Sequence, residues 1–152
     1  MNTMNTDTIE QKRAGLLASW LGCEADDVRQ VGYQHYGLTV YSTPDGEFAV
    51  GDDLQCDLAV RSYIESCVWA LNAEFVLKCC DLPLELTDAI RSFQSKQCED
   101  ANDALLALVN KTCGIERFTD RAIDADGRGH FLASFDGDEN ELLGSVFAYR
   151  VC

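Results

Sequence analysis

The sequence is poor in histidine, the most frequent acid–base catalyst, and in proline, which interrupts helices and strands. Its 152 residues contain only two histidines and two prolines. A Ser-His-Asp or Cys-His mechanism would therefore have to use His35 or His130. No stretch is rich in proline, serine and glycine, as a linker or a disordered half would be. We expect a single domain over residues 1–152, with residues 1–7 frayed.

Basic residues are also scarce. Lys and Arg number 12 and face 26 Asp and Glu, which gives a net charge of -14. Such a charge disfavours direct binding to nucleic acid or to an anionic membrane, and it favours a partner with a positive surface. The excess is uneven, because residues 30–60 and 129–149 contain neither Lys nor Arg.

Long apolar runs and closely spaced cysteine pairs are missing as well. The longest apolar runs, such as residues 104–109, are far shorter than the ~20 residues that cross a bilayer. The N-terminus has no basic segment followed by an apolar one, so no signal peptide is expected. The eight cysteines include no C-x-x-C pair, the spacing typical of zinc and redox sites. We therefore expect a cytoplasmic protein with reduced cysteines, mostly in its core.

The apolar periodicity predicts a largely helical chain. A short helical turn is expected over residues 25–30. Longer helices are predicted over residues 8–21, 53–72, 73–80, 84–96, 99–112 and 115–125.

The clearest strand signal is a hairpin. Two β-rich runs, residues 37–42 and 47–51, flank Thr43-Pro44-Asp45-Gly46. Residues 33–36 extend the first strand or form a bulge before it. Alternating side chains predict a closing strand over 144–151. Residues 131–135 form a further short strand or one helical turn, and we favour the strand. The element order is typical of the α+β class: a small antiparallel sheet, made of the hairpin and the C-terminal strand, packed against about five helices.

One segment carries a candidate active site. Asp126, Arg128 and His130 alternate with Gly127 and Gly129, and they would supply a clamp and an acid–base pair for an enzyme of unknown class. A simpler interpretation is structural, with Gly127 as a helix C-cap, Gly129 as a turn residue and His130 leading into a strand. We favour the structural interpretation and expect a non-enzymatic protein.

Motifs for cofactors and metals are incomplete. Asp136, Asp138 and Asn140 match the first ligand positions of a calcium loop. Glu141 then stands where the loop needs glycine, and Phe147 where it needs a bidentate glutamate. Neither a phosphate-binding loop nor a complete dinucleotide fingerprint occurs. We expect no metal site and no cofactor, and an acidic turn between two strands.

The acidic segments suggest a binding surface instead. If the closing strand pairs with the hairpin, these segments belong to one sheet and can share one end of it, where they would attract a basic protein surface. The expected contact carboxylates are Asp45, Glu47, Asp52, Asp53, Asp57, Asp136, Asp138, Glu139 and Glu141. The alternative is that the acidity serves only solubility or adaptation to salt.

Four segments carry a resemblance to known proteins: YGLTVY at residues 36–41, EFAVG at 47–51, WALN at 69–72 and DGRGHFLASFDG at 126–137. Together they resemble a group of small acidic proteins of phages and other mobile elements that has no established activity. The resemblance implies a short accessory protein inside a bacterial cell. Acidic proteins of such elements often block host defence enzymes by imitating the charge of DNA.

These observations lead to one functional prediction. We expect a non-enzymatic accessory protein that binds a basic surface of a host nucleic-acid-handling or defence protein, in the manner of a DNA mimic. It would bind neither nucleic acid nor a membrane directly, and its oligomeric state is left open. The alternatives are an enzyme with its site at Asp126, Arg128 and His130, and an acidic globular protein whose charge has no binding role.

Overall fold

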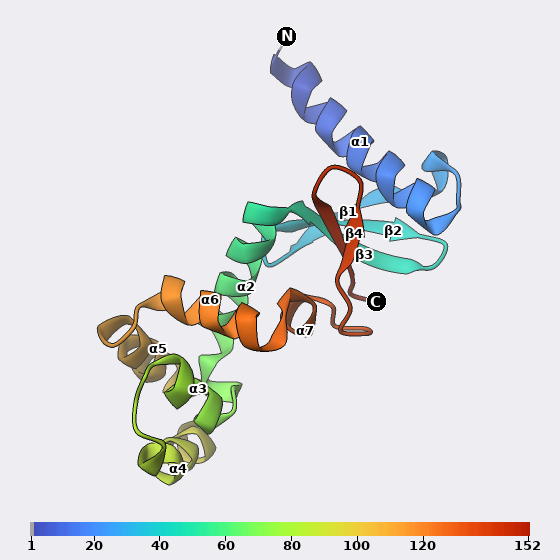
Figure 1. The fold of residues 1–152 in the computed structure, drawn as a ribbon. Helices are drawn as coiled ribbons and strands as arrows, with labels where there is room; N and C mark the ends of the chain where they lie inside the picture. The colour runs from blue at the N-terminus through green and yellow to red at the C-terminus, as the bar shows by residue number, and fades with distance from the viewer. Residues whose placement is uncertain (1) are drawn as a thin grey trace. The chain divides into compact units, whose positions relative to one another are not determined.

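The computed structural model describes residues 2–152 and confirms the α+β class. The chain divides into two compact units. The sheet unit comprises the described residues up to Ala59 together with 128–152, and the helical unit comprises Val60–Gly127 (Figure 1). Whether the chain is one domain over residues 1–152 stays a prediction. Met1 lies outside the described residues.

The sheet unit contains a five-stranded antiparallel sheet with the strand order β1-β2-β3-β5-β4. The predicted hairpin is β2–β3, and the predicted closing strand is β5, which pairs with β3. Both predictions are therefore confirmed. The strands are β1 Arg29–His35, β2 Leu38–Thr43, β3 Gly46–Asp52, β4 Asn140–Leu142 and β5 Val146–Arg150.

The first strand was not expected as a separate element. The helical turn predicted over residues 25–30 is a 3-10 turn at Ala25–Asp27, after which β1 begins. Residues 33–35 belong to β1, and Tyr36 and Gly37, with φ of 51° and 88°, turn the chain into β2. Because β1 is an edge strand whose side chains are mostly exposed, it lacks the alternation that marks a half-buried strand.

The strand favoured over residues 131–135 is wrong, and the helical alternative is correct for its first residues, because this segment contains the end of helix α7 (Arg128–Leu132). Gly129 is therefore a helical residue, and His130 does not lead into a strand. The prediction for Gly127 is confirmed, since it has φ 81° and its N–H donates to Ile123 O at 2.8 Å. Three consecutive buried residues, 131–133, gave a strand-like apolar run.

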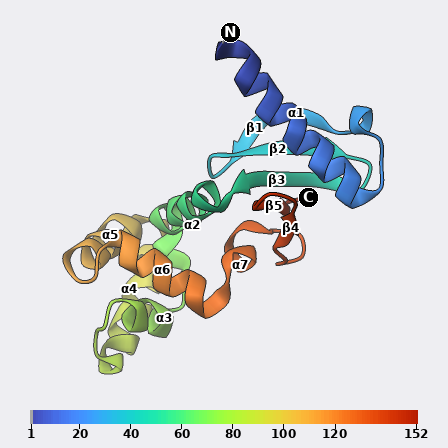
Figure 2. The same ribbon diagram turned by 45° about the horizontal axis from the view of Figure 1, so that its top comes forward.

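Helix α1 (Asn2–Leu21) packs on one face of the sheet (Figure 2). Leu17 and Ala18 share a hydrophobic core with Tyr41, Phe48 and Ala148 from the three central strands. The helix begins six residues before its predicted start at residue 8, so the expected frayed segment 2–7 is helical. It ends at Leu21, as predicted, and Gly22 with φ of 76° follows.

The opposite face of the sheet is buried too. Val40, Ala49 and Tyr149 lie side by side on β2, β3 and β5, and all three are fully buried. Cys56, in the first turns of α2 (Asp53–Cys67), is fully buried and contacts Tyr149. Helix α7 packs against β5 on this side. The sheet is thus the middle layer of its unit.

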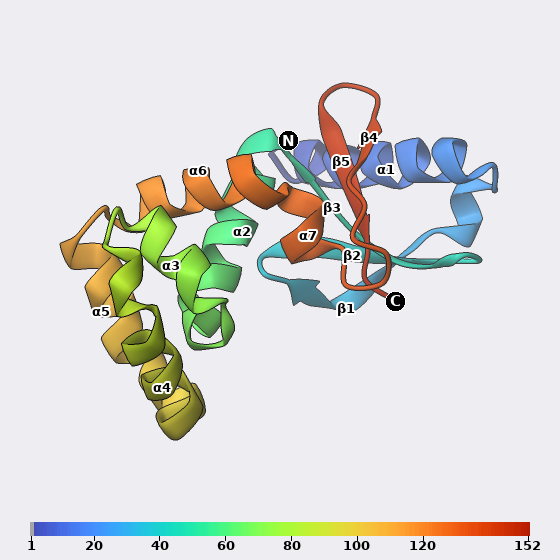
Figure 3. The same cartoon turned by 60° about the horizontal axis from the view of Figure 1, so that its bottom comes forward.

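The helical unit confirms the predicted helices with three changes. The helices predicted from residues 84 and 99 each begin with a 3-10 turn, Leu84–Leu86 and Cys98–Ala101, and the third change is a break after α2. Helix α2 ends at Cys67 instead of continuing to residue 72, and a 3-10 turn, Val68–Ala70, follows. The side chain of Asn102 explains the break, because it donates to Glu65 O at 2.8 Å and accepts from Trp69 N at 3.2 Å. The other helices, which Figure 3 shows with α6 beside α3 and α5, are α3 Ala73–Cys79, α4 Thr87–Gln97, α5 Asn102–Lys111 and α6 Ile115–Asp126.

No helix within the described part of the chain is both long and apolar enough to span a bilayer.

A close backbone contact positions the acidic segment before β4. A Cβ on Gly129 would lie 2.5 Å from Gly137 O and 2.8 Å from Glu139 N. We therefore expect Gly129→Ala to lower the free energy of unfolding by about 1–3 kcal/mol. Gly15→Ala in α1 is the control, because nothing lies within 4 Å of its added Cβ. It should stabilise the chain by about 0.5–1 kcal/mol. Urea unfolding measures both variants, and equal effects would contradict the tight contact at Gly129.

Candidate functional site

Arg128 is the one buried charged side chain among residues 9–152, whose burial the structure describes. It is the first residue of α7, directly after Gly127 turns the chain out of α6. A charge taken out of water is costly unless it is paired and hydrogen-bonded. The groups around this guanidinium therefore define the most constrained polar site of the sheet unit.

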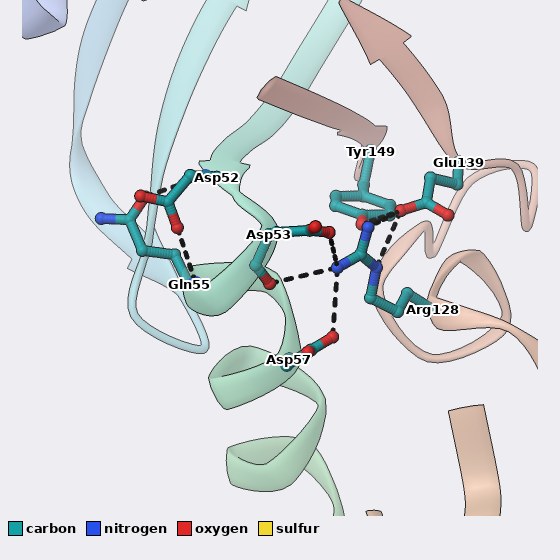
Figure 4. A network of polar contacts seen from close by, with 7 residues as sticks. All are labelled: Asp52, Asp53, Gln55, Asp57, Arg128, Glu139 and Tyr149. Atoms are coloured by element: carbon teal, nitrogen blue, oxygen red, sulfur yellow. Dashed lines mark hydrogen bonds and ion pairs between the residues drawn. The ribbon is translucent and has the colours of Figure 1, made fainter. Parts of the chain in front are cut away.

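Three carboxylates surround the guanidinium (Figure 4). Nη1 of Arg128 lies 2.8 Å from Asp53 Oδ1 and 3.1 Å from Asp57 Oδ1. The backbone carbonyl of Asp53 accepts a further hydrogen bond from Nη1 at 3.1 Å. Glu139 Oε1 accepts from Nε at 2.8 Å and lies 2.5 Å from Nη2. We call Asp53, Asp57 and Glu139 the carboxylate cluster.

The three carboxylates come from two segments of the chain, the start of α2 and the segment before β4. Asp53 and Asp57 are four residues apart at the start of α2, so they lie on one face of that helix. Asp52 caps the helix reciprocally with Gln55, through backbone N–H bonds of 2.8 and 3.0 Å to the two side chains. Glu139 ends the acidic segment that packs against α7 at Gly129.

Two aromatic residues of β5 complete the site. The guanidinium carbon of Arg128 lies 4.4 Å from the ring centre of Phe147, a cation–π contact. The buried hydroxyl of Tyr149 donates to Glu139 Oε1 at 2.7 Å. Burial, together with this hydrogen bond, raises the pKa of Tyr149 well above its ordinary value, so the phenol stays neutral. Burial also raises the pKa of the neighbouring Cys56 thiol to about 11.

The site keeps a negative excess. Burial alone would lower the pKa of Arg128, but the hydrogen bonds to Glu139 and Asp53 raise it, and the guanidinium stays charged. One positive charge thus faces three carboxylates. The Arg128 side chain is 9% exposed, against 72% for Asp53, 51% for Asp57 and 32% for Glu139. The cation is therefore enclosed, while the carboxylates reach the solvent.

The remaining predicted contact carboxylates lie in several places. Asp136 and Asp138 are exposed in the segment leading to Glu139, where Asp136 Oδ1 accepts from Asp138 N at 3.0 Å. Glu141 is exposed in β4. Asp45 lies in the β2–β3 turn, and Glu47 is the second residue of β3.

The predicted contact carboxylates do not form one patch, because they lie near opposite ends of β3. Glu47, whose carboxylate accepts a hydrogen bond from Tyr33, and Asp52, which lies 3.7 Å from Arg13, are at opposite ends of this strand. The structure therefore brings the cluster residues together at the end where α2 begins, and it leaves Asp45 and Glu47 at the other end.

Asp126, Arg128 and His130, the residues of the enzyme alternative, belong to two different units. Asp126 ends α6 in the helical unit, whereas Arg128 and His130 belong to α7 in the sheet unit. His130 is exposed, and its ring contacts Phe131 edge-on at 5.0 Å. Arg128 was singled out as a clamp for a ligand, but its guanidinium binds carboxylates of its own chain.

Sequence reasoning missed Phe147 and Tyr149 as parts of the site and assigned them only to a strand. A signal was present, because the hydroxyl of a buried tyrosine needs a hydrogen-bond partner, and β5 follows an acidic segment. Within residues 2–152, no group of three or more His, Cys, Asp or Glu side chains has an arrangement that holds a metal ion.

No protein-family model, no curated protein and no solved structure matches this chain. The function is therefore inferred from the geometry and charge of the site.

Loss of the central cation is expected to destabilise the sheet unit. In Arg128→Met, three carboxylates would face an apolar side chain. Because these carboxylates keep contact with solvent, the expected cost is about 1–3 kcal/mol of the free energy of unfolding. Arg91→Met is the control, because Arg91 is exposed and pairs with the exposed Asp88 in its own helix. Its effect should stay within about 0.5 kcal/mol. Urea unfolding at neutral pH compares the two, and a small loss in Arg128→Met would contradict the pairing described above.

The buried phenol of Tyr149 should also affect how the free energy of unfolding changes at alkaline pH. In the unfolded chain a tyrosine ionises near pH ~10. The pKa of Tyr149 is raised in the folded chain, so its contribution to stability is fully present below pH ~10 and is lost as the pH rises further. We expect Tyr149→Phe to make the alkaline fall in unfolding free energy less steep. Chemical denaturation at a series of pH values measures this slope, and an unchanged slope would count against a buried, protonated Tyr149.

Proposed function

We propose that the chain is a non-enzymatic acidic accessory protein that binds a basic surface of a nucleic-acid-handling or defence protein of its host. The carboxylate cluster would be the centre of this binding surface. In this respect the protein would act as a mimic of DNA, presenting fixed negative charges to residues that otherwise contact phosphates.

The first support is that the cluster is organised before a partner arrives. The enclosed guanidinium of Arg128 holds Asp53, Asp57 and Glu139 by hydrogen bonds of 2.8 to 3.1 Å. Fixed side chains lose little further freedom on binding, which lowers the cost of association. Their outward oxygens can accept charge-assisted hydrogen bonds from arginine or lysine of a partner.

The second support, and the observation that carries the proposal, is an apolar pair beside the carboxylates. Leu54 and Leu58 follow Asp53 and Asp57 directly on α2, and the leucines are 68% and 49% exposed. The pair of an acidic residue and an exposed leucine therefore occurs twice on α2, one helical turn apart. Acidity that served only solubility would not need exposed leucines, whereas protein interfaces combine apolar contacts with a charged rim.

The third support is the charge of the whole chain. A net charge of -14 repels nucleic acid and anionic lipid and speeds the encounter with a positive surface. Proteins that bind DNA offer such a surface, because DNA carries a negative charge about every 1.7 Å along its axis. No observation of comparable weight favours the enzyme alternative, since the guanidinium of Arg128 is enclosed.

The proposal is tested by capture on the immobilised full chain from a nuclease-treated bacterial lysate. We expect basic nucleic-acid-binding proteins to be retained at low salt, to elute as the salt concentration rises, and to be displaced by added duplex DNA. For the retained protein, Asp53→Asn with Asp57→Asn should weaken binding about tenfold or more, because desolvated charge contacts are lost. Leu54→Ser with Leu58→Ser should also weaken it, with little change in salt dependence.

The matched control is Glu85→Gln with Asp88→Asn, which removes the same charge from an exposed segment of the helical unit. If this pair weakens binding as much as Asp53→Asn with Asp57→Asn, only the overall charge matters and the proposed surface is wrong. Retention of neutral or acidic proteins alone would likewise contradict the proposal.

A further inference from the structure

Three of the eight cysteines gather in the helical unit. Cys79 ends α3 and Cys80 follows it, and both are buried. Cys113 lies in the turn between α5 and α6 and is half-buried. All eight cysteines are free thiols in the structure. The criterion of a C-x-x-C spacing does not reveal such a group, because its members come from separate helices.

The Cys80 thiol lies beside Thr112 and Cys113, and both of these side chains act on its pKa. The Cys113 thiol itself donates to Gly114 O at 3.4 Å. The surrounding packing holds this contact in place. Nη1 of Arg121 in α6 donates to Cys79 O at 2.7 Å and lies 2.8 Å from Asp81 Oδ2, which ties the end of α3 to α6. The rings of Phe75 and Phe118 add an edge-on contact between the same two helices, with centres 6.2 Å apart.

The two thiols differ in access to solvent. Cys113 lines an open pocket of about 570 Å³ together with Arg61, Asn110, Arg117 and the first residues of α6. A molecule as small as hydrogen peroxide can enter such a pocket. Cys80 is 3% exposed, so an oxidant in the pocket reaches Cys113 first.

We propose that Cys113 and Cys80 form a peroxide-responsive thiol pair. The sulfur of Cys113 attacks hydrogen peroxide, the O–O bond breaks, and a sulfenic acid and one water are formed. The sulfur of Cys80 then attacks the sulfenic sulfur, and the departing hydroxyl takes up the thiol proton as a second water. The two electrons that reduce the peroxide come from the two sulfurs, which end as a disulfide.

The environment of the pair fits these separate roles. Burial raises the pKa of the Cys80 thiol to about 11, which suits a resolving thiol that is inert until a sulfenic acid forms beside it. The disulfide would join the end of α3 to the α5–α6 turn and close a loop of about 33 residues around α4 and α5. Oxidation would therefore make the helical unit more rigid. This inference is independent of the function proposed for the sheet unit.

Peptide mapping of the oxidised full chain tests the proposal. The exposed Cys98 and Cys152 are first replaced by serine to prevent cross-linking between molecules. The protein is treated with hydrogen peroxide, remaining thiols are blocked with N-ethylmaleimide, and peptides are mapped without reductant. We expect a loss of two hydrogens from the intact mass, one dominant Cys80–Cys113 peptide, and full reversal by dithiothreitol. The unfolding midpoint of the oxidised protein should rise by roughly 10 °C.

Two variants separate this pair from its neighbour. In Cys80→Ser the disulfide should be lost, and Cys113 should accumulate as a sulfenic acid that reacts with dimedone. In Cys79→Ser the Cys80–Cys113 link should form as before. A dominant Cys79–Cys113 or Cys79–Cys80 bond, or an unmodified Cys113, would overturn the proposal, and the map made with all three thiols present decides this even if a variant fails to fold.

Discussion

The sheet unit depends on how one buried cation is neutralised. The guanidinium of Arg128 is removed from water, and without partners it would cost several kcal/mol of the free energy of folding. Its partners come from the start of α2, from the segment before β4 and from the ring of Phe147 on β5. Segments that are distant in sequence must therefore be in place together. The glycine at 129 allows this, because no side chain separates α7 from the acidic segment.

The same arrangement has a consequence for function, because the cation is over-compensated. A single carboxylate would balance the charge of Arg128, and three are present. The excess stays at the surface, where exposed leucines of α2 lie beside it. The carboxylate cluster thus both pairs with Arg128 and forms a preorganised anionic surface. In this it differs from acidic residues that are spread evenly over a protein. The helical unit has its own chemistry, in a contact of two thiols that differ in exposure.

Much of the fold follows from local patterns in the sequence. The β2–β3 hairpin was predicted because Pro44 and Gly46 specify a turn between two β-rich runs, and most helices were predicted because their apolar periodicity is local. The edge strand β1 lacks a buried face, and α7 is too short to show a period, so both were missed or misassigned. The end of α2 depends on Asn102, a residue far along the chain.

The site was predicted in parts but not as a whole. Asp53, Asp57 and Glu139 were expected in a binding surface, whereas Arg128 belonged only to the alternative of an enzyme active site. Local patterns cannot show that they meet, because the contacts with Asp53 and Asp57 span 75 and 71 residues of sequence. Only the pairing of β3 with β5 and the burial of α7 bring them together. Tyr149 could not be assigned to the site either, because its role depends on the hydrogen bond to Glu139 and not on its position in a strand.

The most direct test of this account is an NMR measurement on the Arg128 side chain in the folded protein at neutral pH. A guanidinium enclosed by three carboxylates and an aromatic ring should give separate Hε and Hη signals that exchange slowly with water, because rotation and solvent access are both restricted. A single averaged set of rapidly exchanging Hη signals, like that of an arginine on the surface, would contradict the account.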